Sequence, residues 1–116
     1  MRILVVDDSP QFVTAVTRFL SAVLQLEVVG HAGSGVEAIE QVARLHPDVV
    51  LMDWMMPEMD GLEATRRIKR ASSPPQVIIL TLNDGSEYRR LAQLAGADGF
   101  VSKGDLGSDL WPLLVH

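Results

Sequence analysis

The chain has 116 residues, 47% of them hydrophobic, and a formal net charge of −5 at pH 7. This length supports a single core and therefore one domain rather than two. The sequence contains no cysteine, which excludes disulfides, thiolate metal sites and a cysteine nucleophile. The negative charge argues against a general affinity for nucleic acid or anionic membranes, because both depend on an excess of lysine and arginine.

No apolar run approaches the roughly 18 residues of a membrane span. The start of the chain, MRILVVDD, lacks the basic flank and the cleavage site of a signal peptide. We therefore expect a cytoplasmic protein that does not associate with membranes.

Five short apolar runs alternate with helix-like stretches along the chain. They cover Ile3–Val6, Leu26–Ala32, Val49–Asp53, Val77–Thr81 and Gly99–Ser102. The interiors of the first, third and fourth runs are apolar without alternation, which is typical of strands that are covered on both faces of a parallel sheet. Because the crossover between parallel neighbours is right-handed, five strand and helix units predict a doubly wound α/β sheet.

Helix starts can be recognised between the runs. Ser9 offers an N-cap before Pro10, and proline suits the first helical position. Pairs with the spacing of a capping box occur at three further places, Ser34 and Glu37, Asp60 and Glu63, and Asp84 and Glu87. The stretch Ser72-Ser73-Pro74-Pro75 indicates only a helix end and a loop. No linker interrupts the series, so we expect residues 1–116 to form one domain.

Polar side chains occupy the ends of the predicted strands. Asp7 and Asp8 end the first strand and Asp53 ends the third. Thr81 ends the fourth strand, and Lys103 closely follows the fifth. Ligands collect at the carboxyl ends of the strands in doubly wound sheets. We therefore expect these side chains to meet at one edge of the sheet.

Three carboxylates at one edge need a cation. Two carboxylates about 5 Å apart repel by about 3 kcal/mol at an effective dielectric constant near 20. Oxygen ligands without cysteine or paired histidine favour Mg²⁺, which needs only one or two carboxylates plus a phosphate oxygen. Lys103 suits a second oxygen of the same phosphoryl group, and the Thr81 hydroxyl suits a third. Asp53, at the end of a central strand, is then the candidate nucleophile that forms an aspartyl phosphate.

These motifs resemble the receiver domain of bacterial two-component response regulators over nearly the whole chain. The matching stretches are ILVVDDSP with Asp7 and Asp8, VVLMDWMMPEMDG with Asp53, Pro57 and Gly61, VIILTLND with Thr81, and GADGFVSK with Phe100 and Lys103. The chain looks closest to receivers of the branch with helix-turn-helix DNA-binding outputs. The resemblance implies a flavodoxin-like (βα)5 fold with strand order 2-1-3-4-5 and a cytoplasmic phosphoprotein that works in phosphorelay signal transduction.

The resemblance also implies roles for the residues at the sheet edge. A sensor histidine kinase would donate the phosphoryl group of its phosphohistidine to Asp53, with Lys103 as a further catalytic residue. Asp8, Asp53 and the backbone carbonyl of Met55 would bind Mg²⁺, and Asp7 would act through water. The domain would catalyse its own phosphorylation and dephosphorylation, although it would be mainly a signalling switch.

The implied switch has two residues and one output surface. Thr81 would swing toward the phosphoryl group, and Phe100 would turn inward behind it. The fourth helix, fifth strand and fifth helix would then present a changed surface to an output domain, an effector protein or a second copy of the chain. Direct nucleic acid binding by this domain is not implied. Pro112 interrupts the last residues, so we expect that the fifth helix is either short or continues beyond this chain.

Three residues depart from the commonest pattern of the family. Lys103 is followed by Gly104 rather than proline, which predicts a looser backbone there. Leu82 is bulky at a position after Thr81 that is often small, and Met55 offers no side-chain hydrogen bond to a hydrolytic water. These departures predict slow access of the phosphodonor or slow loss of the phosphoryl group.

Two other hypotheses explain part of the sequence. Gly33, Gly35 and Ala38 fit the G-x-G-x-x-A pattern of a dinucleotide site, but this reading leaves the strand-end residues without a role. A receiver-like interaction module that is never phosphorylated would keep the fold and discard the chemistry. The presence of all the acidic residues argues against this second alternative.

Overall fold

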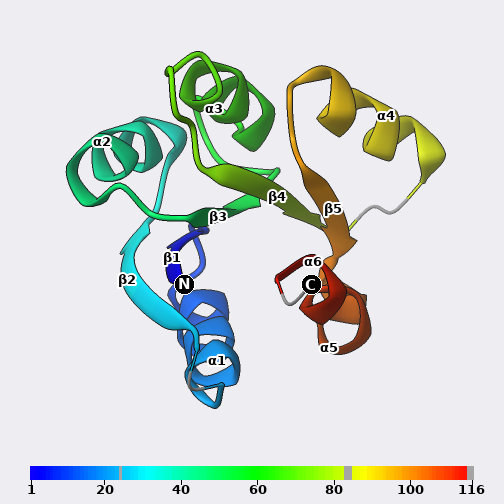
Figure 1. The fold of residues 1–116 in the computed structure, drawn as a ribbon. Helices are drawn as coiled ribbons and strands as arrows, with labels where there is room; N and C mark the ends of the chain where they lie inside the picture. Colours follow the sequence, from blue (N-terminus) through cyan, green and yellow to red (C-terminus); the bar gives the residue numbers. More distant parts are fainter. Residues whose placement is uncertain (24, 83–84, 115–116) are drawn as a thin grey trace.

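The structure is a computed structural model that describes residues 1–23, 25–82 and 85–114. Strands and helices alternate from the first residues to the last strand (Figure 1). The strands are β1 (Arg2–Val6), β2 (Glu27–Ala32), β3 (Val49–Asp53), β4 (Gln76–Thr81) and β5 (Gly99–Ser102). The main helices are α1 (Pro10–Ser21), α2 (Gly35–Leu45), α3 (Gly61–Ile68) and α4 (Ser86–Leu94). Each strand lies within one residue of its predicted bounds.

The strands form one parallel sheet in the order β2-β1-β3-β4-β5. This arrangement confirms the predicted doubly wound α/β fold and its strand order. The order reverses between β1 and β3, because the chain first builds outward to β2 and then crosses back to the other side of β1. The carboxyl ends of β1 and β3 therefore lie side by side at the switch point, where such sheets bind their ligands.

Two apolar layers cover the two faces of the sheet. Along β1, Leu4 and Val6 belong to the cluster beneath α2, α3 and α4, whereas Ile3 and Val5 belong to the cluster beneath α1 and the C-terminal helices (Figure 1). Successive strand residues point to opposite faces, so an unbroken apolar run is what a strand between two helical layers requires. All five residues of β3 are buried.

Three of the four predicted helix starts are confirmed. The side chains of Ser9, Ser34 and Asp60 each accept a hydrogen bond from a backbone N–H three residues later, at 3.3, 3.1 and 3.0 Å. These bonds satisfy amides that the helix itself leaves without partners. The fourth prediction falls on Asp84, which lies outside the described residues. The structure begins α4 one residue later than that prediction implies, with Gly85 at the N-cap position and no side-chain cap.

The chain after β5 folds into short helical pieces. A 3-10 turn, η1 (Lys103–Asp105), leads into α5 (Leu106–Asp109) and α6 (Trp111–Leu114). In the part of the chain that the structure describes, α5 is short, which is one of the two alternatives expected. Leu110 and Leu114 are buried against the sheet, so this segment completes the layer begun by α1. Among the described residues, none of the helices has both the length and the apolar character that crossing a membrane would require.

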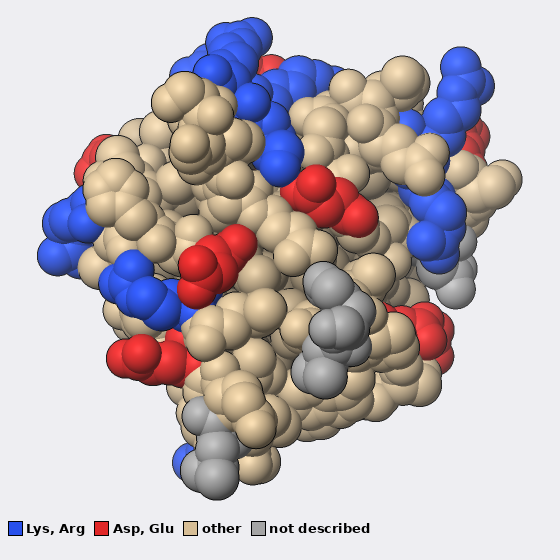
Figure 2. All heavy atoms as spheres, in the orientation of Figure 1, with Lys and Arg blue, Asp and Glu red and all other residues tan. Residues whose placement is uncertain are grey.

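Charged side chains of both signs share the surface. Figure 2 shows lysine and arginine near the rim of one face, with acidic side chains between them. On α3, Arg66 and Arg67 are exposed and both pair with Glu63, at 3.2 and 2.9 Å. The basic run of α3 is therefore a solvated helix face with internal pairing rather than a continuous basic patch.

Candidate functional site: an acidic cluster at the sheet switch point

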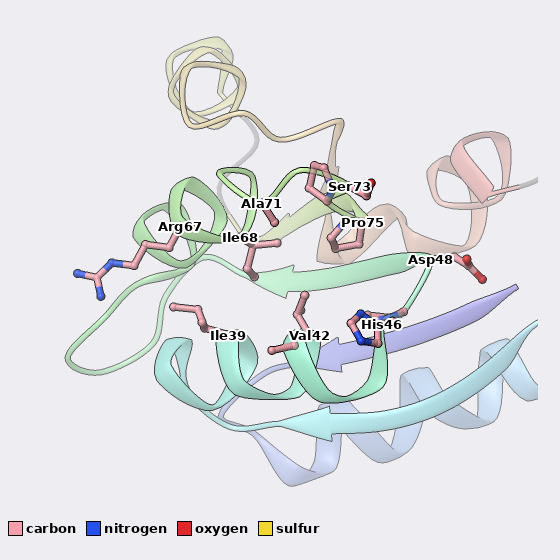
Figure 3. Close-up of a pocket in the computed structure, with 12 residues that line it drawn as sticks. Ile39, Val42, His46, Asp48, Arg67, Ile68, Ala71, Ser73 and Pro75 are labelled. Carbon is pink, nitrogen blue, oxygen red and sulfur yellow. The ribbon is translucent and has the colours of Figure 1, made fainter.

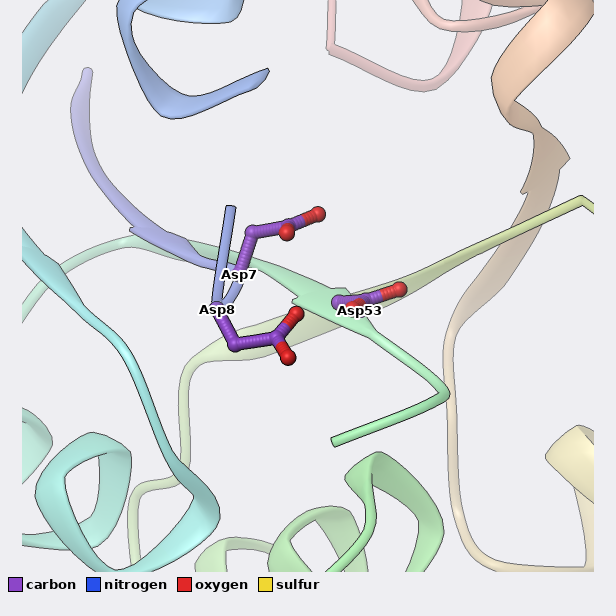
Figure 4. Close-up of side chains that lie close together, drawn as sticks. All are labelled: Asp7, Asp8 and Asp53. Atoms are coloured by element: carbon purple, nitrogen blue, oxygen red, sulfur yellow. The ribbon is translucent and has the colours of Figure 1, made fainter. Parts of the chain in front are cut away.

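Three carboxylates meet where β1 and β3 end. Asp7 and Asp8 directly follow β1, Asp53 is the last residue of β3, and the three side chains extend into the same space (Figure 4). One carboxylate oxygen from each residue lies within 4.8 Å of the others. Asp7 and Asp53 are each only 3% exposed, whereas Asp8 is exposed. The predicted acidic edge therefore exists, and it combines two buried carboxylates with one that faces solvent.

Lys103 neutralises the buried part of this cluster. Its Nζ donates to Asp7 Oδ2 at 2.7 Å and lies 3.0 Å from Asp53 Oδ1. The other oxygen of Asp7, Oδ1, accepts a hydrogen bond from the backbone N–H of Ser9 at 2.8 Å. One ammonium thus joins the ends of β1 and β3 to the turn after β5. Asp8 contributes further negative charge on the open side, where a cation from solvent has access.

Burial and charge act in opposite directions on the site. Burial raises the pKa of Asp53 above 3.8, the hydrogen bond from Lys103 lowers it, and the neighbouring charges of Asp7 and Asp8 raise it. The net direction is upward. For Lys103, burial lowers the pKa, but the hydrogen bonds to Asp7 and Asp53 outweigh burial, so the pKa rises above its ordinary value. The ammonium therefore remains charged, while Asp53 is a more basic carboxylate than an exposed aspartate.

Backbone contacts hold Asp53 in place. The N–H of Trp54 donates to Leu80 of the next strand at 3.0 Å, and the N–H of Gly61 donates to Trp54 at 2.9 Å. A Cβ on Gly61 would overlap the carbonyl oxygen of Asp53, so only glycine permits this approach of α3 to the end of β3. The loop between them, which includes Met55, is thereby tied back onto the strand.

Thr81 and Phe100 lie on the two strands beyond β3. Thr81 is buried at the end of β4 and pairs in register with Ser102 of β5. The Phe100 side chain is also buried, and its ring lies edge-on to Trp54 with centroids 6.3 Å apart. The switching role of Phe100 stays a prediction, because the structure shows a single position of its ring.

Sequence reasoning did not identify the partners of these residues. Tyr88 packs edge-on against Trp54 with centroids 5.3 Å apart, and the Arg89 guanidinium lies 4.8 Å from the centre of the Phe100 ring. On the other side of the site, Lys103 Nζ lies 4.3 Å from the centre of the Phe12 ring. These contacts join residues from separate elements, and no spacing in the sequence signals them.

Two apolar side chains are prominent near the site. Met55 is 66% exposed in the loop after β3, and Leu82 is 80% exposed just after β4. Because they stand in solvent, neither contributes to the core. The predictions that Leu82 slows access of the phosphodonor and that Met55 slows loss of the phosphoryl group stay predictions.

The donor set of the cluster fits a hard divalent cation. Its ligand atoms are carboxylate oxygens, two carboxylates are buried, and the third is open to solvent, which leaves room for water ligands. Lys103 balances only part of the negative charge of the three carboxylates. A small cation that prefers oxygen would balance the rest.

The dinucleotide hypothesis loses its main physical support in the structure. A Cβ on Gly35 would come within 2.8 Å of the carbonyl oxygen of Met59. The glycine is therefore explained by the close packing of the loop before α3 on the start of α2. This packing gives Gly35 a structural role that needs no nucleotide.

A cavity of about 570 Å³ lies away from the acidic cluster. It is formed between α2, α3 and the loop that precedes β4 (Figure 3). Its lining includes His46 and Asp48 just before β3, and Pro75 just before β4. It therefore opens at the amino ends of the strands, opposite the acidic cluster, and shares none of the predicted site residues.

Comparison with known proteins identifies a family that covers most of the chain. The family model described as the response regulator receiver domain matches residues 3–110. Response regulator GacA of Pseudomonas viridiflava is 41% identical over 104 residues, which cover 90% of this chain and 49% of that protein. A protein-glutamate methylesterase/protein-glutamine glutaminase of Geobacillus kaustophilus is 42% identical over 114 residues, which cover 96% of this chain and 33% of that protein. The chain thus spans about half or less of the length of these relatives.

Solved structures show the same fold. The signal receiver domain of the response regulator NarL from Mycobacterium tuberculosis superposes with a TM-score of 0.91 at 32% identity, covering 98% of this chain and 92% of that one. The response regulator domain of CheB from Thermotoga maritima superposes with a TM-score of 0.83 at 34% identity, covering 89% and 78%. Sequence and structure therefore agree along almost the whole chain.

Proposed function

The chain belongs to the response regulator receiver domain family, the phosphorylatable switch of two-component systems, and from this premise we propose that Asp53 accepts the phosphoryl group. The observation that carries the proposal is the placement of Asp53. It is a buried carboxylate at the sheet switch point, linked to Lys103 at 3.0 Å and flanked by two further carboxylates. We also propose that residues 1–116 act as one phosphoacceptor unit.

In the proposed reaction, an oxygen of Asp53 forms a bond to phosphorus while the P–N bond of a donor phosphohistidine breaks. The histidine nitrogen keeps the electron pair of that bond and takes a proton from solvent. Burial favours the reaction because it raises the pKa of Asp53 and so makes the oxygen more basic. Lys103, already at the site, is placed to meet the charge that develops on the transferred group.

We propose that Asp8, Asp53 and the backbone carbonyl of Met55 hold Mg²⁺, with Asp7 acting through water. The buried side chain of Asp7 supports this division, because both of its oxygens already have protein partners, Ser9 and Lys103. When bound, Mg²⁺ would supply charge neutralisation for the phosphoryl oxygens. Asp8, on the open side of the cluster, is the residue most accessible to a hydrated ion.

The output is proposed to pass through Thr81 and Phe100 to the α4-β5-α5 surface. A phosphoryl group on Asp53 offers new acceptor oxygens to Thr81 and Lys103 and thereby biases a two-state arrangement after β4. Phe100 connects this region to α4, because its ring contacts both Trp54 and Arg89.

The partners are proposed from the family. A sensor histidine kinase is the expected donor, and an output domain, an effector protein or a second copy of the chain would meet the α4-β5-α5 surface. The two curated relatives carry different printed functions, a response regulator and a methylesterase, so the receiver portion does not by itself specify an output. The cytoplasmic location remains a prediction.

The proposed function can be tested by intact mass after incubation with acetyl phosphate, a small phosphodonor. We expect one added phosphoryl group that requires both Mg²⁺ and Asp53. An Asp53→Asn variant should stay at its original mass, whereas an Asp105→Asn variant, altered at an exposed carboxylate, should gain the group. A wild-type protein that folds but gains no mass would overturn the proposal and favour the unphosphorylated interaction module.

The exposed Met55 and Leu82 give a prediction about rates. Met55 has no side-chain hydrogen bond to offer a hydrolytic water, and Leu82 adds bulk beside Thr81. We expect Leu82→Ala to speed phosphorylation by acetyl phosphate and Met55→Asn to speed loss of the phosphoryl group, each by about threefold to tenfold, which corresponds to about 0.7–1.4 kcal/mol. Time courses of intact mass measure both rates. Self-dephosphorylation of the wild type within seconds would contradict the second part.

A further inference from the structure

Among the described residues, the ammonium of Lys103 lies against two carboxylates and one aromatic ring. Asp7 and Asp53 take hydrogen bonds or ion pairs at 2.7 and 3.0 Å, and the ring of Phe12 lies 4.3 Å from Nζ. This distance is well within the range of about 6 Å over which an aromatic face attracts a cation. The Lys103 side chain is only 16% exposed, so the interaction is partly shielded from water.

The position of Phe12 depends on the same aspartate that binds Lys103. Asp7 Oδ1 accepts from the Ser9 N–H at 2.8 Å, and Ser9 Oγ accepts from the Phe12 N–H at 3.3 Å. The Phe12 ring then faces Lys103, which donates to Asp7 Oδ2 at 2.7 Å. The contacts form a closed ring of four residues. Within this cycle of contacts, the N-cap residue Ser9 also fixes the position of the Phe12 side chain.

We propose that Phe12 is a positioning residue for Lys103 in phosphoryl transfer, an inference that rests on the proposed function. Transfer of a phosphoryl group to Asp53 changes what Lys103 must bind, because one carboxylate oxygen becomes the bridging oxygen of an acyl phosphate and new phosphoryl oxygens appear. An aromatic face holds an ammonium without consuming a hydrogen-bond donor. Phe12 therefore keeps Nζ beside the acceptor while the oxygen partners of Lys103 are exchanged.

Fluorination of Phe12 can separate the attraction between its ring and the Lys103 ammonium from the packing of the ring in the core. Successive fluorination of the Phe12 ring weakens the negative potential of its face and changes its volume little. If the ring positions Lys103, the phosphorylation rate with acetyl phosphate should fall stepwise with fluorine number. Phe12→Leu, which removes the aromatic face, should lose at least about twofold to fivefold in rate, the lower range for a cation–π contact. Phe12→Trp should retain the rate.

Phe19 provides a matched control on the same helix. It is half-buried, packs against the same core and contacts Trp111 with ring centroids 4.7 Å apart, far along the helix from Lys103. Phe19→Leu should therefore leave the phosphorylation rate within the error of the wild type. Thermal unfolding of both leucine variants would show the similar loss of packing that makes the comparison valid.

A second measurement needs neither metal nor phosphodonor. The ε-methylene protons of Lys103 should show an upfield ring-current shift by NMR in metal-free wild type, and Phe12→Leu should abolish it while Phe19→Leu does not. A wild-type protein that is not phosphorylated would overturn the proposed function itself. A wild type that is phosphorylated, with rates independent of fluorination and equal in Phe12→Leu, would overturn the positioning role alone.

Discussion

At the scale of single residues, the site keeps a carboxylate where burial disfavours its charge. Asp53 is 3% exposed, and Lys103 must also serve Asp7. An ionised group in this position reduces the free energy of unfolding unless its charge is fully compensated. The reactive carboxylate therefore has a stability cost in the absence of a bound cation.

This cost predicts a pH-dependent effect of Asp53→Asn. The folded pKa of Asp53 lies above its unfolded value of 3.8, so the folded state binds the proton more tightly. The contribution of Asp53 to stability is complete below the unfolded pKa and is lost as pH rises through the folded pKa. In the presence of a chelator, Asp53→Asn should unfold a few degrees higher than wild type at pH 7, and the difference should shrink toward pH 4.

Calorimetry across this pH range would check the prediction. Asp105→Asn serves as the control, because Asp105 is exposed and its substitution should give no comparable gain. An Asp53→Asn variant that is less stable than wild type at every pH would show that the contact with Lys103 outweighs burial.

The meeting of the carboxylates with Lys103 could be predicted from the sequence because these residues lie at or near strand ends. Asp7, Asp53 and Lys103 each follow an apolar run, and parallel topology brings such ends together. Phe12 and Tyr88 could not be predicted, because their roles depend on side-chain contacts between elements. Nothing in the local sequence of α1 indicates that its first turn faces the end of β5.

At the scale of elements, the helix ends show how far local chemistry determines structure. The caps at Ser9, Ser34 and Asp60 agree with prediction because each bond is local to three residues. In a complete capping box the Glu63 carboxylate would also accept from the backbone, but it binds Arg66 and Arg67 instead. Strong charge partners on the same helix compete for a side chain that a capping pattern assigns to the backbone.

The C-terminal end of α2 supports a stability prediction. His46 caps this helix in the left-handed region, with φ 49°, and its N–H donates to Val42 at 3.0 Å. Glycine adopts this conformation without the steric cost of a Cβ. His46→Gly should therefore raise the free energy of unfolding by roughly 0.5–1 kcal/mol.

A matched change on the same helix should have the opposite sign. Ala43 is exposed in the interior of α2, and glycine there should lower the free energy of unfolding by roughly 0.5–1 kcal/mol. Urea unfolding measures the change in the free energy of unfolding for both variants. Destabilisation by His46→Gly would mean that the exposed imidazole makes a contribution larger than the backbone strain.

At the scale of the whole molecule, the acidic cluster should couple metal binding to stability. A cation that binds only the folded state raises the free energy of unfolding by about 2.7 kcal/mol at a concentration 100 times its Kd. We expect the midpoint of thermal unfolding to rise with Mg²⁺ in wild type and to rise much less in Asp8→Asn. Differential scanning calorimetry with Mg²⁺ and with chelator measures both responses.

NaCl at three times the concentration of MgCl₂, which matches its ionic strength, tests whether ionic strength alone raises the midpoint. An identical response of wild type and Asp8→Asn to Mg²⁺ would show that the ion acts outside the acidic cluster.

Some features of the overall architecture could be predicted from the sequence, and others could not. The apolar runs and the right-handed crossover rule predict a doubly wound sheet, because a strand buried on both faces requires helices on both sides. The strand order 2-1-3-4-5 came from resemblance, since apolar runs do not specify which neighbours pair. The large cavity between α2 and α3 was not predicted, because it arises from imperfect packing between helices.

The contact between Asp7 and Lys103 spans 96 residues of sequence, and this separation has a consequence for synthesis on the ribosome. At about 5–20 residues per second, Lys103 is added roughly 5–20 s after Asp7. Both aspartates that bind this lysine are therefore made well before their counter-charge. The proposed acceptor site of a nascent chain is therefore incomplete until Lys103 has been added, even though Asp7 and Asp53 are already in place.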